Sequence, residues 1–193
     1  FYPMGVRGTD DLQWKTRWAD VYKMVPRPFR GPMAGKAVPW LSVYGNHDLS
    51  QLDLECSCRS DTRKCHQVQQ HGFQLVANMS WFMPDVSYFA HPIDGLPLEV
   101  VALDFNAIDT VKLCPWVACN REDCNAGEMP FVPNGCTEIE CVHNLKKREG
   151  AAAQLLRERV EANVAAGARH MLVFSHYPVD HLRGRRPAGI DVL

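Results

Sequence analysis

The sequence lacks the features that mark several classes of protein. No apolar run approaches the roughly 18 residues that a membrane-spanning helix needs, and the chain has no internal repeat, low-complexity tract or interdomain linker. Neither sign of charge dominates, because 21 Lys and Arg residues stand against 22 Asp and Glu residues. This balance gives no reason to expect a partner among nucleic acids or membrane surfaces. No glycine-rich phosphate loop and no Ser or Cys triad is recognisable either.

The composition is that of a globular domain. Of the 193 residues, 46% are hydrophobic and 22% are charged, which excludes disordered, collagen-like and coiled-coil classes. The length suits one domain or most of a larger one. Phe1 opens the chain without a signal-peptide pattern, and residues 189–193 end it without a closing element. We therefore expect a fragment whose N- and C-terminal portions are missing.

Eight cysteines are many for a chain of this length. They are Cys56, Cys58, Cys65, Cys114, Cys119, Cys124, Cys136 and Cys141. An even number in polar, loop-like sequence predicts disulfides, and hence an oxidising compartment. The alternative is a zinc cluster built from Cys56, Cys58, Cys65 and His66, although C-x-C is not the usual zinc-knuckle spacing. The glycosylation sequon at residues 78–80 agrees with secretion.

Apolar periodicity predicts two helices, over residues 10–25 and 144–166, the second ended by Gly167. Lys146 and Arg148 lie largely off the apolar stripe of the second helix, so we expect both on its solvent-exposed face. The cysteine-rich stretches show little periodicity. We expect irregular, cross-linked loop insertions there, at about residues 50–72 and 112–143.

Short apolar runs bounded by turn residues predict four strands. These cover residues 38–44, 86–90, 98–103 and 170–174. Strands interleaved with helices indicate an α/β fold, and we expect residues 1–193 to be part of a single domain.

Polar side chains follow two of these strands at the point where each ends. Gly45-Asn46-His47-Asp48 follows the first strand, and Ser175-His176-Tyr177-Pro178 follows the last. The carboxyl ends of strands in α/β sheets meet at a common crevice, so we expect the two segments to lie close together. Gly45 allows the sharp turn that aims Asn46 and His47 inward.

These side chains suit a metal site with oxygen and nitrogen ligands. The carbonyl oxygen of Asn46 and an imidazole nitrogen of His176 can bind a divalent first-row ion. His47 can then stay unbound, to contact a substrate oxyanion or protonate a leaving group, with Asp48 orienting its ring. Each motif alone is more often a surface turn or a histidine paired with backbone. Both together, each at a strand end, favour the metal site.

The motifs resemble those of the calcineurin-like metallophosphoesterase superfamily. Residues 45–48 match its GNH[DE] motif, and residues 175–179 resemble its GHxP motif in the HYPV form of the purple, tartrate-resistant type acid phosphatases. Phe1-Tyr2 is similar to the end of their GDNFY motif, and residues 109–114 resemble their segment before the second half. The likeness runs with gaps through most of the chain, and the cysteine-rich stretches match poorly.

The resemblance implies part of a fold in which helices sandwich two mixed β-sheets. It also implies an acid phosphatase that hydrolyses phosphate monoesters at a binuclear metal centre. Tyr2 would be the phenolate ligand of Fe(III), Asn46 and His176 would bind a divalent Fe, Zn or Mn ion, and His47 would be catalytic. Substrates would be small phosphate esters or phosphoproteins, and the enzyme would be a secreted or lysosomal glycoprotein.

The family's DxH and GHxH motifs and the start of GDNFY are absent from the chain. Three candidate ligands cannot hold two metals, so we expect the 193-residue segment to be inactive by itself. Two other hypotheses remain. One is a phosphodiesterase of the same superfamily, and the other is a non-catalytic, disulfide-rich extracellular binding protein on a phosphatase scaffold.

Overall fold

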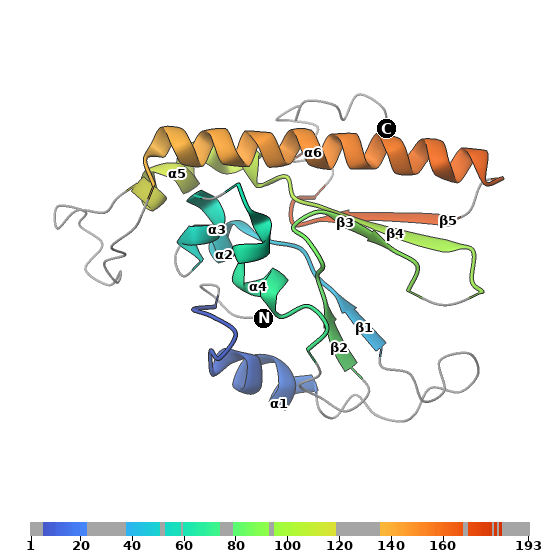
Figure 1. The fold of residues 1–193 in the computed structure, drawn as a ribbon, viewed down its shortest axis with the longest axis horizontal. Coiled ribbons are helices and arrows are strands. Elements are labelled where there is room, and N and C mark those ends of the chain that lie inside the picture. Colours follow the sequence, from blue (N-terminus) through green and yellow to red (C-terminus); the bar gives the residue numbers. More distant parts are fainter. Residues whose placement is uncertain are drawn as a thin grey trace.

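A computed structural model gives the fold of the chain (Figure 1). It describes residues 6–22, 38–50, 53–58, 60–73, 79–92, 95–118, 136–167, 170–178, 180 and 182. These residues form two small β-sheets with helices around them, which confirms the α/β class.

The first sheet pairs two strands in parallel. Strand β1 (Val38–Leu41) lies beside β2 (Met79–Phe82), a strand that the sequence patterns did not predict. β1 ends three residues before the predicted boundary, because Ser42 bonds to a side chain and leaves the ladder. Its N–H donates to the hydroxyl oxygen of Tyr88 (2.9 Å), and that hydroxyl lies 2.8 Å from the Ser42 carbonyl oxygen, which can accept from it.

The second sheet has three strands in the order β3-β4-β5. Strand β3 (Tyr88–Ala90) is antiparallel to β4 (Leu98–Leu103), and β5 (His170–Ser175) is parallel to β4. The predictions for β4 and β5 are confirmed to within one residue, while β3 is shorter than expected. Among the described strands, only this sheet mixes the two directions.

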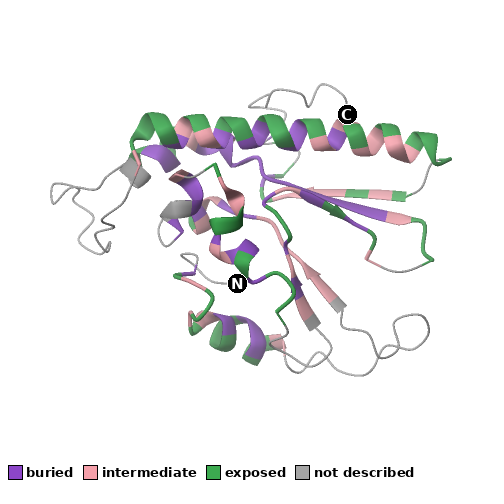
Figure 2. Cartoon of the chain, in the orientation of Figure 1, coloured by how far each residue is buried: buried purple, intermediate pink, exposed green. Residues whose placement is uncertain are grey.

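Helix α6 (Glu138–Ala165) runs along the second sheet and covers it (Figure 1). Ala152 and Leu156 pack on Val101 and Leu103 of β4 in a buried cluster. Figure 2 shows how completely β4 is buried. Gly167, with φ of +86°, follows the helix, as predicted.

Helix α6 begins six residues before the predicted start. Thr137 is its N-cap: the Thr137 hydroxyl accepts from the Glu140 N–H, and the Glu140 carboxylate accepts from the Thr137 N–H. The prediction that residues 112–143 are irregular is therefore wrong at this end. It is also wrong at the other end, where helix α5 spans Thr110–Ala118.

The solvent-exposed position expected for Arg148 is also wrong. Its guanidinium is buried, bonds to the carbonyl oxygen of Cys56 and lies 3.6 Å from the Asp104 carboxylate. A charge can be buried in this way because it has paired acceptors.

Three disulfides cross-link the described residues: Cys56–Cys65, Cys58–Cys136 and Cys114–Cys141. The disulfide prediction is confirmed for these pairs, and the zinc cluster drawn with Cys56, Cys58 and Cys65 is excluded. Cys119, Cys124 and the sequon residue Asn78 lie outside the described residues. The first cysteine-rich stretch is not a plain loop. It contains the short helices α3 (Leu54–Cys58), η3 (Thr62–Lys64) and α4 (His66–Gln69).

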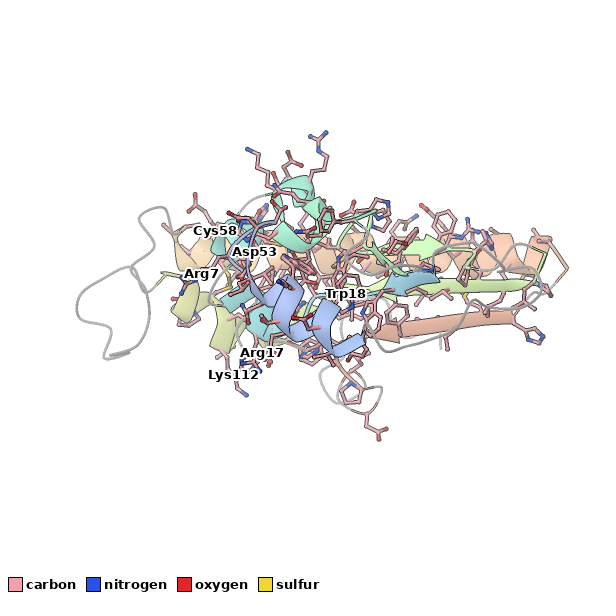
Figure 3. The ribbon with its side chains drawn as sticks, turned by 90° about the horizontal axis from the view of Figure 1, so that it is seen from below. Arg7, Arg17, Trp18, Asp53, Cys58 and Lys112 are labelled. Atoms are coloured by element: carbon pink, nitrogen blue, oxygen red, sulfur yellow. A yellow bond between two sulfur atoms is a disulfide. The ribbon has the colours of Figure 1, made fainter. Side chains whose placement is uncertain are left out.

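The N-terminal helix packs through tryptophans. A π-helical segment, η1 (Trp14–Ala19), continues into α1 (Asp20–Tyr22), which confirms the predicted helix over residues 14–22. Residues 10–12 are not helical, so the helix begins later than predicted. Trp18, labelled in Figure 3, extends from this helix. It is fully buried and meets Trp81 of β2 edge to face, with 5.5 Å between the ring centroids. In the described part of the chain, no helix combines the length and apolarity needed to cross a membrane.

Candidate metal centre

The two strand-end segments meet in space. Asn46 opens the short helix α2 (Asn46–Ser50) beyond β1, and His176 directly follows β5 of the other sheet. The Asn46 side-chain oxygen Oδ1 lies 3.2 Å from His176 Nε2, across a sequence separation of 130 residues. The structure thus brings together two of the four predicted site residues, Asn46 and His176. Their nearest atoms are an amide oxygen and an imidazole nitrogen, the two kinds of metal ligand that the sequence predicted.

Gly45 makes the approach of His176 to Asn46 possible because it has no side chain. A Cβ placed on Gly45 would lie 3.0 Å from both Cε1 and Nδ1 of the His176 ring, closer than side chains normally pack. Gly45 is not one of the described glycines with a positive φ. Freedom for a sharp turn, which the sequence suggested, is therefore not why glycine is needed at this position. The ring of His176 occupies the space that a side chain on residue 45 would fill.

His47 and Asp48 flank the pair. His47 is exposed, so a solute can reach its ring. The Asp48 carboxylate accepts the Gly45 N–H at 2.7 Å and so fixes the first turn of α2. The predicted role of Asp48 in orienting His47 stays a prediction.

The pKa of His176 is lowered, first by partial burial and second by the neighbouring positive charge of His47. Asp109 and Asp104 oppose this shift. A lowered pKa keeps the imidazole neutral over more of the acidic range, and the neutral ring is the form that binds metal ions.

The Asn46 carboxamide has defined partners on both of its polar atoms. The His47 backbone N–H donates to Oδ1 at 3.0 Å, and Nδ2 donates to Oδ2 of Asp109 at 3.4 Å. Asp109 ends the short helix η4 (Asn106–Asp109), which follows β4, and its side chain is 7% exposed.

A buried polar network lies beneath this pair. The Tyr177 hydroxyl is within 3.2 Å of Asp109 Oδ2 and 3.3 Å of Asn106 Oδ1. Asn106 in turn donates from Nδ2 to the Tyr44 carbonyl oxygen (3.1 Å) and to Asp104 (2.7 Å). Burial, and then the charge of Asp109, raise the pKa of Tyr177 far above its ordinary value, so its hydroxyl remains a donor.

The sequence reasoning did not assign a role to Asp104, Asn106, Asp109 or Tyr177. The sequence did contain one indication of a role for Asp104 and Asn106: they follow the end of strand β4, as Asn46 follows β1. Asp109 and Tyr177 stand in segments that the sequence analysis quoted, but no local pattern could assign their contacts, since their partners lie 63 to 71 residues away.

The donors fit a cation. Two ligand atoms that each lie about 2.1 Å from one ion stand roughly 3.0–3.4 Å apart at octahedral or tetrahedral angles. The separation of Asn46 Oδ1 and His176 Nε2, 3.2 Å, falls in that range. Within the described ranges, no group of three or more His, Cys, Asp or Glu residues could hold a metal ion. Tyr2, the predicted ligand of the ferric ion, lies outside the described residues.

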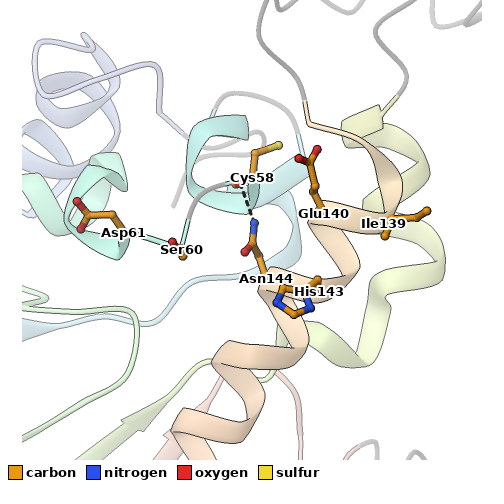
Figure 4. Close-up of a pocket in the computed structure, with 7 residues that line it drawn as sticks. All are labelled: Cys58, Ser60, Asp61, Ile139, Glu140, His143 and Asn144. Atoms are coloured by element: carbon orange, nitrogen blue, oxygen red, sulfur yellow. Dashed lines mark hydrogen bonds between the residues drawn. The ribbon is translucent and has the colours of Figure 1, made fainter.

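A separate pocket of about 560 Å³ opens between the loop after α3 and the start of α6 (Figure 4). It is lined by Cys58, Ser60, Asp61, Ile139, Glu140, His143 and Asn144. Both of its carboxylates already bond to protein groups, Asp61 to Arg63 and Glu140 to Thr137. None of the predicted site residues lines this pocket.

Comparison with known proteins adds no relative to this geometry. No family model matches the chain, and neither does any curated protein or solved structure.

Proposed function

We propose that the chain contributes half of a binuclear metal centre to an acid phosphatase that hydrolyses phosphate monoesters. The observation that carries this proposal is the 3.2 Å approach of Asn46 Oδ1 to His176 Nε2. The motifs around these residues support membership of the calcineurin-like metallophosphoesterases, with purple acid phosphatases the nearest in pattern.

Asn46 and His176 would hold the divalent ion, and Tyr2 would bind Fe(III). When bound, such a metal pair lowers the pKa of water and offsets the charge that develops on the phosphoryl group. Asn46 contributes a neutral oxygen donor and His176 a neutral nitrogen donor, so neither adds negative charge that would repel an anionic substrate. Both are exposed or half-buried, as a site open to substrate requires.

His47 would act on the substrate directly. Its ring is exposed, and its charge affects the pKa of His176, so the two rings are near each other. A protonated imidazole there can donate a hydrogen bond to a phosphate oxygen or a proton to the leaving oxygen.

Three disulfides are compatible with a secreted or lysosomal enzyme. The substrates would be small phosphate esters or phosphoproteins. The ligands that this chain lacks would have to come from the protein that contains it, so the segment alone is proposed to be inactive.

The test is hydrolysis of p-nitrophenyl phosphate and bis(p-nitrophenyl) phosphate by the protein that contains this chain. Asn46→Ala and His176→Ala are expected to lower monoester hydrolysis more than about 100-fold, because each removes a metal ligand. The matched controls Asn144→Ala and His143→Ala, on α6, should retain wild-type rates. Preference for the diester would favour the phosphodiesterase alternative. No hydrolysis and no metal in the purified protein would favour the binding-protein alternative.

A further inference from the structure

The Asn46 carboxamide has two unlike ends, and only its oxygen can bind a cation. Oδ1 and Nδ2 have nearly the same shape, so shape alone does not decide which of them faces His176. The hydrogen-bond partners of the amide decide it instead.

Those partners are of opposite kinds. The His47 backbone N–H is only a donor, and it requires Oδ1 at its 3.0 Å position. The Asp109 carboxylate is only an acceptor, and it requires Nδ2 at its 3.4 Å position. Rotating the amide by 180° would set N–H against N–H and oxygen against carboxylate, and both bonds would be lost. Oδ1 therefore faces His176 Nε2.

The Asp109 carboxylate is itself held in place. It is 7% exposed, and the Tyr177 hydroxyl lies 3.2 Å from the oxygen that accepts from Asn46. Tyr177 directly follows His176, so one loop supplies both the proposed ligand and the group that fixes Asp109. The contact joins η4 to the ends of strands from both sheets.

We infer that Asp109 is a positioning residue of the metal centre, which holds the Asn46 carboxamide with its oxygen toward the cation site. The orienting contact stands on the geometry of Asn46, His47 and Asp109, and its consequence for metal binding rests on the proposed function.

The experiment compares Asp109→Leu, Asp109→Asn and wild type of the full protein, first without metal. Nitrogen-15 NMR follows the Asn46 side-chain amide, assigned by its loss in Asn46→Ala. In wild type we expect slow rotation and slow hydrogen exchange of this amide. Asp109→Leu should abolish both, while Asp109→Asn should restore them in part, because its carbonyl oxygen can still accept from Nδ2. The control for general destabilisation is Glu99→Leu, which removes a different buried carboxylate, one that lies on β4.

The same proteins are then titrated with Mn²⁺ by calorimetry. Asp109→Leu should bind it about 10- to 100-fold more weakly than wild type, the usual effect of losing a group that orients a ligand. An Asn46 amide signal that is unchanged in Asp109→Leu overturns the inference, whether or not Mn²⁺ binds. If the amide signal responds but wild type and His176→Ala bind Mn²⁺ equally, the orienting role holds and the proposed function fails.

Discussion

The His176 ring lies against the Cα of Gly45, so close that an added Cβ would be 3.0 Å from two ring atoms. This contact joins the turn after β1 to the loop after β5. It predicts that Gly45 tolerates no side chain without displacing the histidine.

Gly45→Ala should move the imidazole away from Asn46 and weaken Mn²⁺ binding by about 10-fold or more. Gly150→Ala is the matched control, because a Cβ there meets nothing within 4 Å. Gly150 lies inside helix α6, so its replacement should stabilise the fold by about 0.5–1 kcal/mol and leave Mn²⁺ binding unchanged. Calorimetric titration and urea unfolding measure the two effects. Equal Mn²⁺ affinity in the two variants would contradict the prediction.

Asp53 should make stability depend on pH. Its carboxylate is 1% exposed, and burial raises its pKa, against the opposing effects of His66 and the Tyr44 hydroxyl. The native state then binds this proton more tightly than the unfolded chain does. The free energy of unfolding therefore has its full Asp53 contribution below about pH 3.9 and loses it as the pH rises through the raised native pKa.

The check is urea unfolding of wild type and Asp53→Asn at a series of pH values from 3.5 to 7. The stability of wild type minus that of the variant should fall as the pH rises. If this difference in stability stays constant or grows as the pH rises, burial does not dominate the pKa of the Asp53 carboxyl.

Thr137→Ala should destabilise the protein by about 1 kcal/mol, because it removes the cap of helix α6. Thr16→Ala is the matched control, since Thr16 is exposed within η1 and its hydroxyl bonds only back to the Leu12 carbonyl oxygen (3.2 Å) among the contacts described. We expect the control to change stability by less than about 0.5 kcal/mol. Thermal and urea unfolding would disprove the prediction if the two variants were equally stable.

The disulfides should differ in what they contribute. Cys58–Cys136 joins residues 78 apart, and Cys56–Cys65 joins residues 9 apart. On the chain-entropy model, the first stabilises by roughly 4.5 kcal/mol and the second by roughly 2.5 kcal/mol. Replacing each pair by serines and measuring urea midpoints tests the order. A larger loss for the short loop would point to the contacts between Arg148 and Cys56 rather than to chain entropy.

The sequence could predict what local pattern determines. β4, β5 and the body of α6 follow from apolar runs and periodicity, and residues 45–48 and 175–178 follow from polar residues at strand ends. The capping box of Thr137 and Glu140 was also readable, because its spacing is local. The predicted helix start at residue 144 lies seven residues beyond this cap.

The remainder depends on contacts that no local pattern encodes. Arg148 is buried only because Cys56 and Asp104, distant in sequence, supply its acceptors. Asp109 bonds to Asn46 across 63 residues, and its place beside Asn46 follows from how α5, which continues directly from η4, packs against α2. β2 was not predicted because the alternation of Met79, Ser80 and Trp81 is short, and the strand is fixed instead by its pairing with β1.

The two sheets contribute one proposed ligand each, and this has a consequence for assembly. Asn46 follows a strand of the first sheet and His176 a strand of the second, so neither half of the fold contains the pair by itself. Contacts between residues this far apart in sequence form late, after the local helices and hairpins. An ion that binds both side chains can therefore bind only after the two sheets have packed together. Metal binding would then report that folding is complete.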